Sequence, residues 1–98
     1  MAEFIFLMHG DATSPEDGAA WGPYLAGLRS AAVFEGGSSV GPGLSLRKSG
    51  APGAVSSHIV GYIKVRADDL DHAARFLAGN PVHEAGGTVE IRELPRDD

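Results

Sequence analysis

The feature that most constrains the fold is an unbroken apolar run, Phe4 to Met8, near the start of the chain. Aromatic and branched residues predominate from Glu3 to His9, and Gly10 and Asp11 end the run, a pattern typical of a β-strand. Alternate residues of a strand point to opposite faces, so both faces of this strand are apolar. We therefore expect a central strand that is covered on both sides.

A helix is predicted next. Ser14 suits the N-cap and Pro15 the first helical position, and apolar residues then recur at helical spacing from Trp21 to Ala32. Gly22-Pro23 interrupts this pattern, so we expect the helix to be kinked or split there.

The rest of the chain predicts a glycine-rich hairpin, two strands with alternating polarity, and a second helix. Asp68 is the expected cap of that helix and Gly79 its expected end. The hairpin, with irregular ends, is predicted at Glu35–Gly53 and has strand-like pieces at Ser38–Val40 and Leu44–Arg47. The two strands are predicted at Ser57–Arg66 and at Thr88–Leu94.

This order of elements predicts a single α+β domain over residues 1–98, a ferredoxin-like βαββαβ sandwich with an extra hairpin. Two helices cover one face of such a sheet. The other face would carry part of the apolar first strand together with Val60 and Tyr62, and an exposed patch of this kind usually marks an interface. We therefore expect a homodimer in which two sheets pack face to face.

Composition excludes several classes of function. The chain has no cysteine, so disulfides, thiolate metal sites and cysteine nucleophiles are ruled out. Its net charge is −5 and its cations are scattered, which disfavours nucleic acid as a partner. The apolar run is too short to span a membrane, and no positively charged segment precedes it. We therefore expect a cytoplasmic protein without a cofactor. We also expect no metal, because the Asp68–His72 cluster is better explained by helix capping than by metal binding.

His9 and Asp11 are the candidate catalytic residues. They stand where the first strand runs into the loop before a helix, a place where sites tend to form. A partly desolvated Asp11 beside an imidazole would be suited to proton transfer. The alternative is structural: Asp11 caps the loop and His9 merely ends the strand. Trp21, Tyr24 and His58 are candidate ligand-binding neighbours.

A second motif, Gly37-Ser38-Ser39-Val40-Gly41, matches the G-x-S-x-G nucleophile elbow. That elbow requires a helix after the serine, whereas Pro42-Gly43 follows here, so we interpret the segment as a turn.

The chain resembles the YCII-related family, especially its DGPF-domain branch. This resemblance covers nearly the whole chain and rests on 3–11, 13–16, the Trp21 helix, 59–62, 67–71, 80–82 and 86–92. It implies a dimeric α+β barrel, in a family whose members mostly have no established function. Ser49-Gly50-Ala51-Pro52 stands where the branch has its D-G-P-F tetrapeptide. Asp11 matches the aspartate of the family's His–Asp dyad, but Tyr24 stands near the position of its histidine.

Two functions follow as hypotheses. The first, which the missing helix histidine favours, is a small-molecule-binding or accessory protein with a cleft near Asp11. The alternative is a cofactor-free enzyme, of isomerase, lyase or monooxygenase type, in which Asp11 and His9 move protons.

Overall fold

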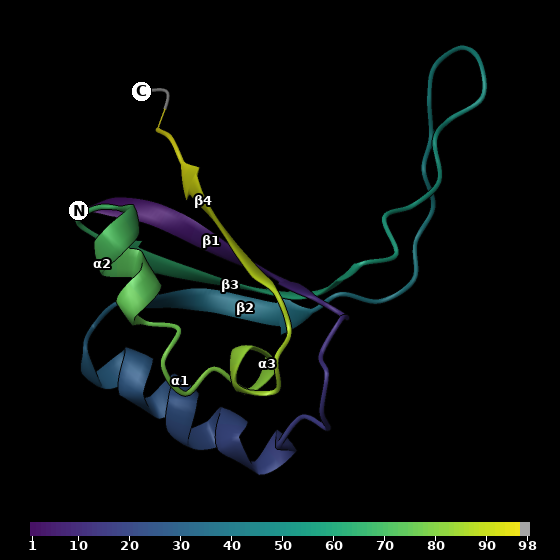
Figure 1. Cartoon of the computed structure of the whole chain (residues 1–98). Helices are drawn as coiled ribbons and strands as arrows, with labels where there is room; N and C mark the ends of the chain where they lie inside the picture. The colour runs from purple at the N-terminus through teal and green to yellow at the C-terminus, as the bar shows by residue number, and fades with distance from the viewer. Residues whose placement is uncertain (97–98) are drawn as a thin grey trace.

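The apolar first strand, β1 (Ala2–His9), lies inside a four-stranded antiparallel sheet, as its sequence predicts. In this computed structural model, which describes residues 1–96, the strand order is β2–β3–β1–β4, and β1 pairs with both β3 and β4 (Figure 1). The other strands are β2 (Phe34–Ser39), β3 (Ile59–Ala67) and β4 (Val89–Leu94). The chain is therefore an α+β protein.

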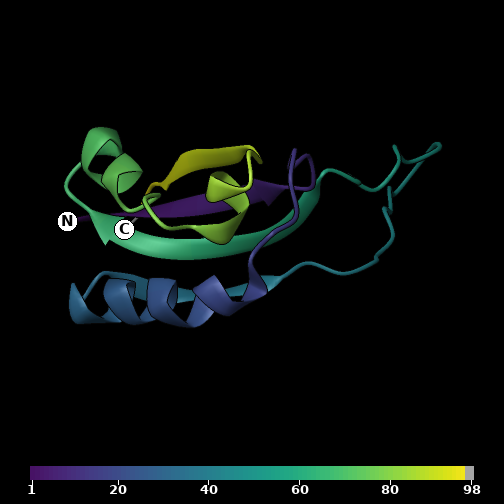
Figure 2. The same cartoon turned by 60° about the horizontal axis from the view of Figure 1, so that its bottom comes forward.

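The two faces of the sheet differ in what covers them. Phe4, Phe6 and Met8 are buried beneath the helices and form a core with the inward residues of β3. The helices all lie on this side of the sheet (Figures 1 and 2). Ile5 and Leu7 point to the opposite side, here called the open face, where they remain only half-buried within one chain.

The first helix starts later than the sequence predicts. Ser14 and Pro15 do not begin it: Asp17 caps a short 3-10 turn, η1 (Gly18–Ala20), by accepting a hydrogen bond from the Ala19 amide. The α-helix that follows is α1 (Trp21–Ser30). Pro23 thus falls in its first turn, where backbone N–H groups have no partner within the helix, so the proline fits the helix without interrupting it.

The second helical region is also displaced from its predicted bounds. Asp69 rather than Asp68 caps α2 (Leu70–Arg75). Its carboxylate accepts a hydrogen bond of 2.8 Å from the backbone amide of His72. Asn80 then caps a further short helix, α3 (Pro81–Glu84), beyond Gly79, where the sequence predicts that the second helix ends. Pro81 occupies the first position of this helix, where proline is favoured, whereas Pro15, for which the sequence predicts such a position, does not begin a helix.

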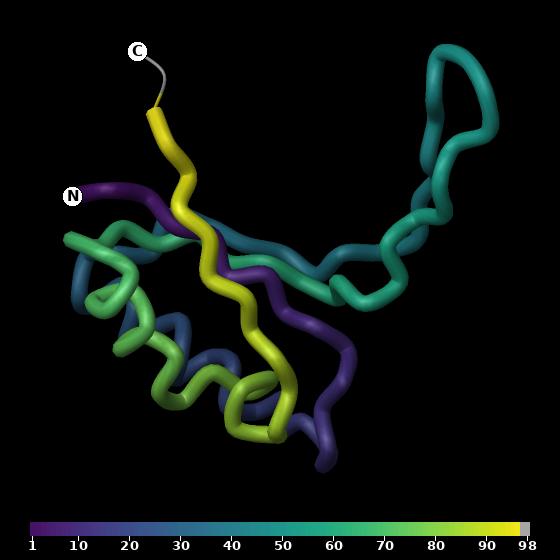
Figure 3. Tube along the Cα trace, turned by 45° about the horizontal axis from the view of Figure 1, so that its top comes forward, coloured from purple at the N-terminus to yellow at the C-terminus, as the bar shows by residue number. Residues whose placement is uncertain are grey.

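The predicted extra hairpin is wrong. No strand forms over 44–47; instead β2 and β3 pair with each other, and residues 40–58, here called the arm, connect them without regular secondary structure. The ladder ends at the hydrogen bond from the Val40 amide to the Val60 carbonyl, after which the glycines and proline of 41–43 interrupt it. Figure 3 shows the arm projecting from the sheet on the side opposite to the helices.

Candidate functional site

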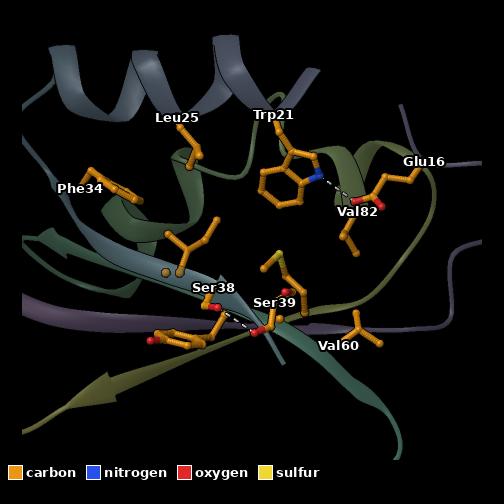
Figure 4. Close-up of a pocket in the computed structure, with 13 residues that line it drawn as sticks. Glu16, Trp21, Leu25, Phe34, Ser38, Ser39, Val60 and Val82 are labelled. Carbon is orange, nitrogen blue, oxygen red and sulfur yellow. Dashed lines mark hydrogen bonds between the residues drawn. The ribbon is translucent and has the colours of Figure 1, made fainter. Parts of the chain in front are cut away.

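A cavity of about 380 Å³ lies between α1 and the edge of the sheet formed by β2 and β3. Figure 4 shows Trp21 and Leu25 reaching from α1 toward the strands that form the opposite wall. Most of the lining is apolar; the residues are Met8, Glu16, Trp21, Leu25, Phe34, Gly37, Ser38, Ser39, Val60, Gly61, Tyr62, Ile63 and Val82. This volume is within the range of ordinary small-molecule sites.

Two glycines line the cavity on the strands opposite Trp21. Gly61 occupies an inward position of β3, two residues before the buried Ile63, and a Cβ there would come within 3.0 Å of Met8 Cε, which also lines the cavity. Gly37 lies on β2 opposite Ile63, and a Cβ there would come within 2.6 Å of the Tyr62 carbonyl oxygen. Glycine is therefore required at position 37 by the close approach of the two strands.

Few polar groups face this cavity, and one of them is charged. The Glu16 carboxylate accepts a hydrogen bond of 3.0 Å from Trp21 Nε1, which holds the indole and the carboxylate together at the cavity wall (Figure 4). The Ser38 hydroxyl donates to the carbonyl of Ser39 at 2.8 Å. An apolar cavity with one carboxylate suits a small apolar molecule that carries a cationic or hydrogen-bond-donating group.

His9 belongs to a second group of side chains, at the end of β1. Its Nε2 lies 3.2 Å from Glu90 Oε1, and its ring meets the edge of the His58 ring at a centroid distance of 4.9 Å. Arg92 donates a hydrogen bond of 3.0 Å to the other oxygen of Glu90. This bond from Arg92, followed by the contact with His9, lowers the pKa of Glu90.

Asp11 directs both carboxylate oxygens at one residue. Thr88 donates its backbone N–H to one of them at 2.7 Å and its hydroxyl to the other at 2.6 Å. These bonds, the hydroxyl's first, lower the pKa of Asp11, and the nearby His9 adds a smaller electrostatic effect in the same direction. The carboxylate thus ties the loop after β1 to the residue that precedes β4.

The structure separates the five residues singled out from the sequence. His9 and His58 are in contact, and Asp11 is near enough to His9 to sense its charge. Tyr24 is buried in the core, where its hydroxyl donates to the Phe76 carbonyl at 2.7 Å and burial raises its pKa. Of these five, all within the described residues, only Trp21 lines the α1 cavity.

The residues that the sequence reasoning missed are the ones that make the cavity. Glu16 lies in the loop before η1, and the sequence does not predict its place at the cavity. Ser38 and Ser39 lie in the edge strand β2, within the strand-like piece predicted at Ser38–Val40 and not in a turn, but their place at the cavity is not predicted either. No helix follows these serines, which confirms that the segment is not a nucleophile elbow. Glycines on two paired strands, at 37 and 61, were the available signal.

Neither the protein-family models nor the curated proteins compared with this chain include a match to it. The resemblance to the YCII-related family therefore remains a prediction. Within residues 1–96, no set of three or more His, Asp or Glu side chains is arranged to hold a metal ion. A helix long and apolar enough to cross a membrane is likewise not found in this range.

Proposed function

We propose that this protein binds a small, mainly apolar molecule with a cationic group in the α1 cavity. The observation that carries the proposal is the cavity itself: space of about 380 Å³, walled by Trp21 and Leu25 and floored by Gly61, with the Glu16 carboxylate at its wall. This moves the expected cleft from the neighbourhood of Asp11 to the space beneath α1. Apolar lining supplies the affinity, and the carboxylate supplies orientation.

The same proposal includes a ferredoxin-like fold, membership of the YCII-related family and a dimeric barrel. The strand order β2–β3–β1–β4, with antiparallel neighbours throughout, supports the first. The dimer is supported by the open face, where Ile5, Leu7 and Tyr62 are half-buried and Val60 is exposed. Two such faces packed together would remove these side chains from water.

Titration with simple probes tests the binding proposal. Trp21 is the only tryptophan in the chain and lines the cavity, so its fluorescence reports occupancy directly. We expect benzylamine to bind more tightly than toluene, and toluene more tightly than benzoate. Replacing the carboxylate, in Glu16→Gln, should remove the advantage of benzylamine over toluene. Glu93→Gln, which neutralises an exposed carboxylate outside the cavity, should preserve it.

A cavity-filling variant separates this site from adventitious binding. Leu25→Phe adds bulk from the α1 side and should weaken benzylamine binding by about tenfold or more, because one extra buried ring displaces the ligand. Leu70→Phe, at an exposed position of α2, is the matched control. Equal affinity in wild type and Leu25→Phe, or no binding by any of the three probes, would contradict the proposal.

A second candidate function is a cofactor-free enzyme that uses His9 and Asp11 for proton transfer. The observation that favours it is the His9–His58–Glu90 group, which brings two imidazoles and a carboxylate together at the end of β1. Metabolites that shift the melting temperature should then be converted, as followed by proton NMR. We expect Asp11→Asn and His9→Gln to reduce turnover by about 10²-fold or more while ligand binding is retained. Binding without turnover would contradict the enzyme function and retain only the binding function.

A further inference from the structure

The arm, residues 40–58, extends beyond the body of the protein. It has no helix or strand, and Figures 1 and 3 both show it rising on the open-face side of the sheet. The radius of gyration is 14.9 Å. A compact domain of this length would have about 13 Å. The excess is the signature of a segment that finds little to pack against within its own chain.

The outer part of this arm is apolar. Leu44 is 75% exposed and Leu46 is 85% exposed, and both are among the most exposed large apolar residues of the described chain. Val40 and Val55, nearer the base of the arm, are also exposed. Apolar side chains held this far from the body gain nothing from folding of a single chain, but they would gain from burial on another surface.

Charge indicates what that surface is. Arg47 and Lys48 are the charged residues of the arm, which contains no carboxylate. Of the 8 cations and 13 acidic residues in the chain, the remainder therefore holds 8 − 2 = 6 cations and all 13 acids, a net charge of −7. An arm of charge +2 with apolar residues beside its cations is complementary to the acidic body of another copy of the same chain.

We propose that the arm docks on a second copy of this protein, burying Leu44 and Leu46 against it and placing Arg47 and Lys48 near its carboxylates. The inference rests on the open-face dimer proposed above, because the arm rises on the side where that second copy would sit. A two-fold axis makes the contact reciprocal, so each copy clasps the other with its own arm. The arm's tip is already shaped by a hydrogen bond of 3.2 Å from Arg47 to the Ala51 carbonyl.

Sedimentation equilibrium tests the contribution of the arm. The double variant Leu44→Ser, Leu46→Ser should raise the dimer dissociation constant by about tenfold or more, with an unchanged circular dichroism spectrum, because neither residue belongs to the core. Leu70→Ser is the matched control: Leu70 is 53% exposed on α2, and its loss should leave the dimer unchanged. Arg47→Gln with Lys48→Gln should reduce the salt dependence of dimerisation.

Crosslinking locates the docking site. The chain has no cysteine, so Leu46→Cys provides a unique attachment point for a benzophenone photocrosslinker. Mixed samples of isotope-labelled and unlabelled protein should give crosslinks between copies, from the arm to the body. A dimer that is unaffected by the serine variants, together with crosslinks confined to one chain or to a different protein, would overturn arm docking alone. A monomeric wild type would overturn the dimer as well.

Discussion

Replacement of Asn80 by alanine should destabilise the protein more than a change at a small polar residue ordinarily does. Asn80 has 0% of its surface exposed. Its Oδ1 accepts hydrogen bonds from the amides of Val82 at 3.0 Å and His83 at 3.1 Å, and its Nδ2 lies 3.8 Å from Met8 Sδ. One side chain therefore caps α3 and joins it to β1.

The magnitude follows from what alanine leaves behind. Loss of an N-cap costs about 1 kcal/mol. The Val82 amide also loses its acceptor within the core, and a buried unsatisfied donor costs about 1–3 kcal/mol. The two terms overlap in part, so the total is less than their sum, and we expect Asn80→Ala to lower the free energy of unfolding by about 1.5–3 kcal/mol. In a domain of this size that corresponds to a melting temperature lower by roughly 6–24 °C.

Urea unfolding, followed both by circular dichroism and by Trp21 fluorescence, measures this change. Asn80→Ser retains a capping hydroxyl and should lose clearly less stability than Asn80→Ala. His83→Ala, at an exposed position of the same helix, is the control for a general effect of truncation in α3. An Asn80→Ala protein within about 0.5 kcal/mol of wild type, the range of neutral surface changes, would refute the reasoning.

Three further predictions concern the groups around the core and the strand ends. Burial raises the pKa of Tyr24, so the folded state should lose stability as the pH rises above about 10, and Tyr24→Phe should abolish this loss in pH-dependent melting. Thr88 lowers the pKa of Asp11, so the ionised carboxylate stabilises the fold at neutral pH. This stabilisation should be lost as the pH falls below about 4. Thr88→Val should therefore raise the pKa of Asp11 in a carboxyl NMR titration. Gly86 has a φ of 87°, and a Cβ there would collide with the Thr13 hydroxyl, so Gly86→Ala should cost at least about 1–2 kcal/mol in urea unfolding.

The sheet was predictable because its signal is local. The doubly apolar β1 and the alternation of β3 follow directly from side-chain direction, and both strands lie within about two residues of their predicted bounds. Helix starts were less predictable, because several capping residues compete in each region. Ser14, Asp17, Asp68 and Asp69 all have suitable side chains, and only the backbone geometry selects Asp17 and Asp69.

The cavity could not be predicted in the same way. It depends on which residues of β2 and β3 lie side by side, and the register between two strands separated by a long arm is a tertiary property. Trp21 was predicted as a ligand-binding neighbour of His9 and Asp11, and it lines the cavity beneath α1, which contains neither of them. Glu16 could not be found from the sequence, since its role arises from the hydrogen bond to that indole.

The strand β2 connects the cavity with the arm. Its Ser39 lines the cavity, and the next residue, Val40, begins the arm and bonds to the carbonyl of Val60, which also lines the cavity. A second copy that holds the arm would therefore also hold this part of the cavity wall. If holding this wall tightens ligand binding, linkage requires that the ligand tightens dimerisation by the same factor. Benzylamine should lower the dimer dissociation constant of wild type, and the Leu44→Ser, Leu46→Ser protein should bind benzylamine more weakly although both substitutions lie outside the cavity. Benzylamine affinities that are equal in monomer and dimer would show that the arm and the cavity are independent.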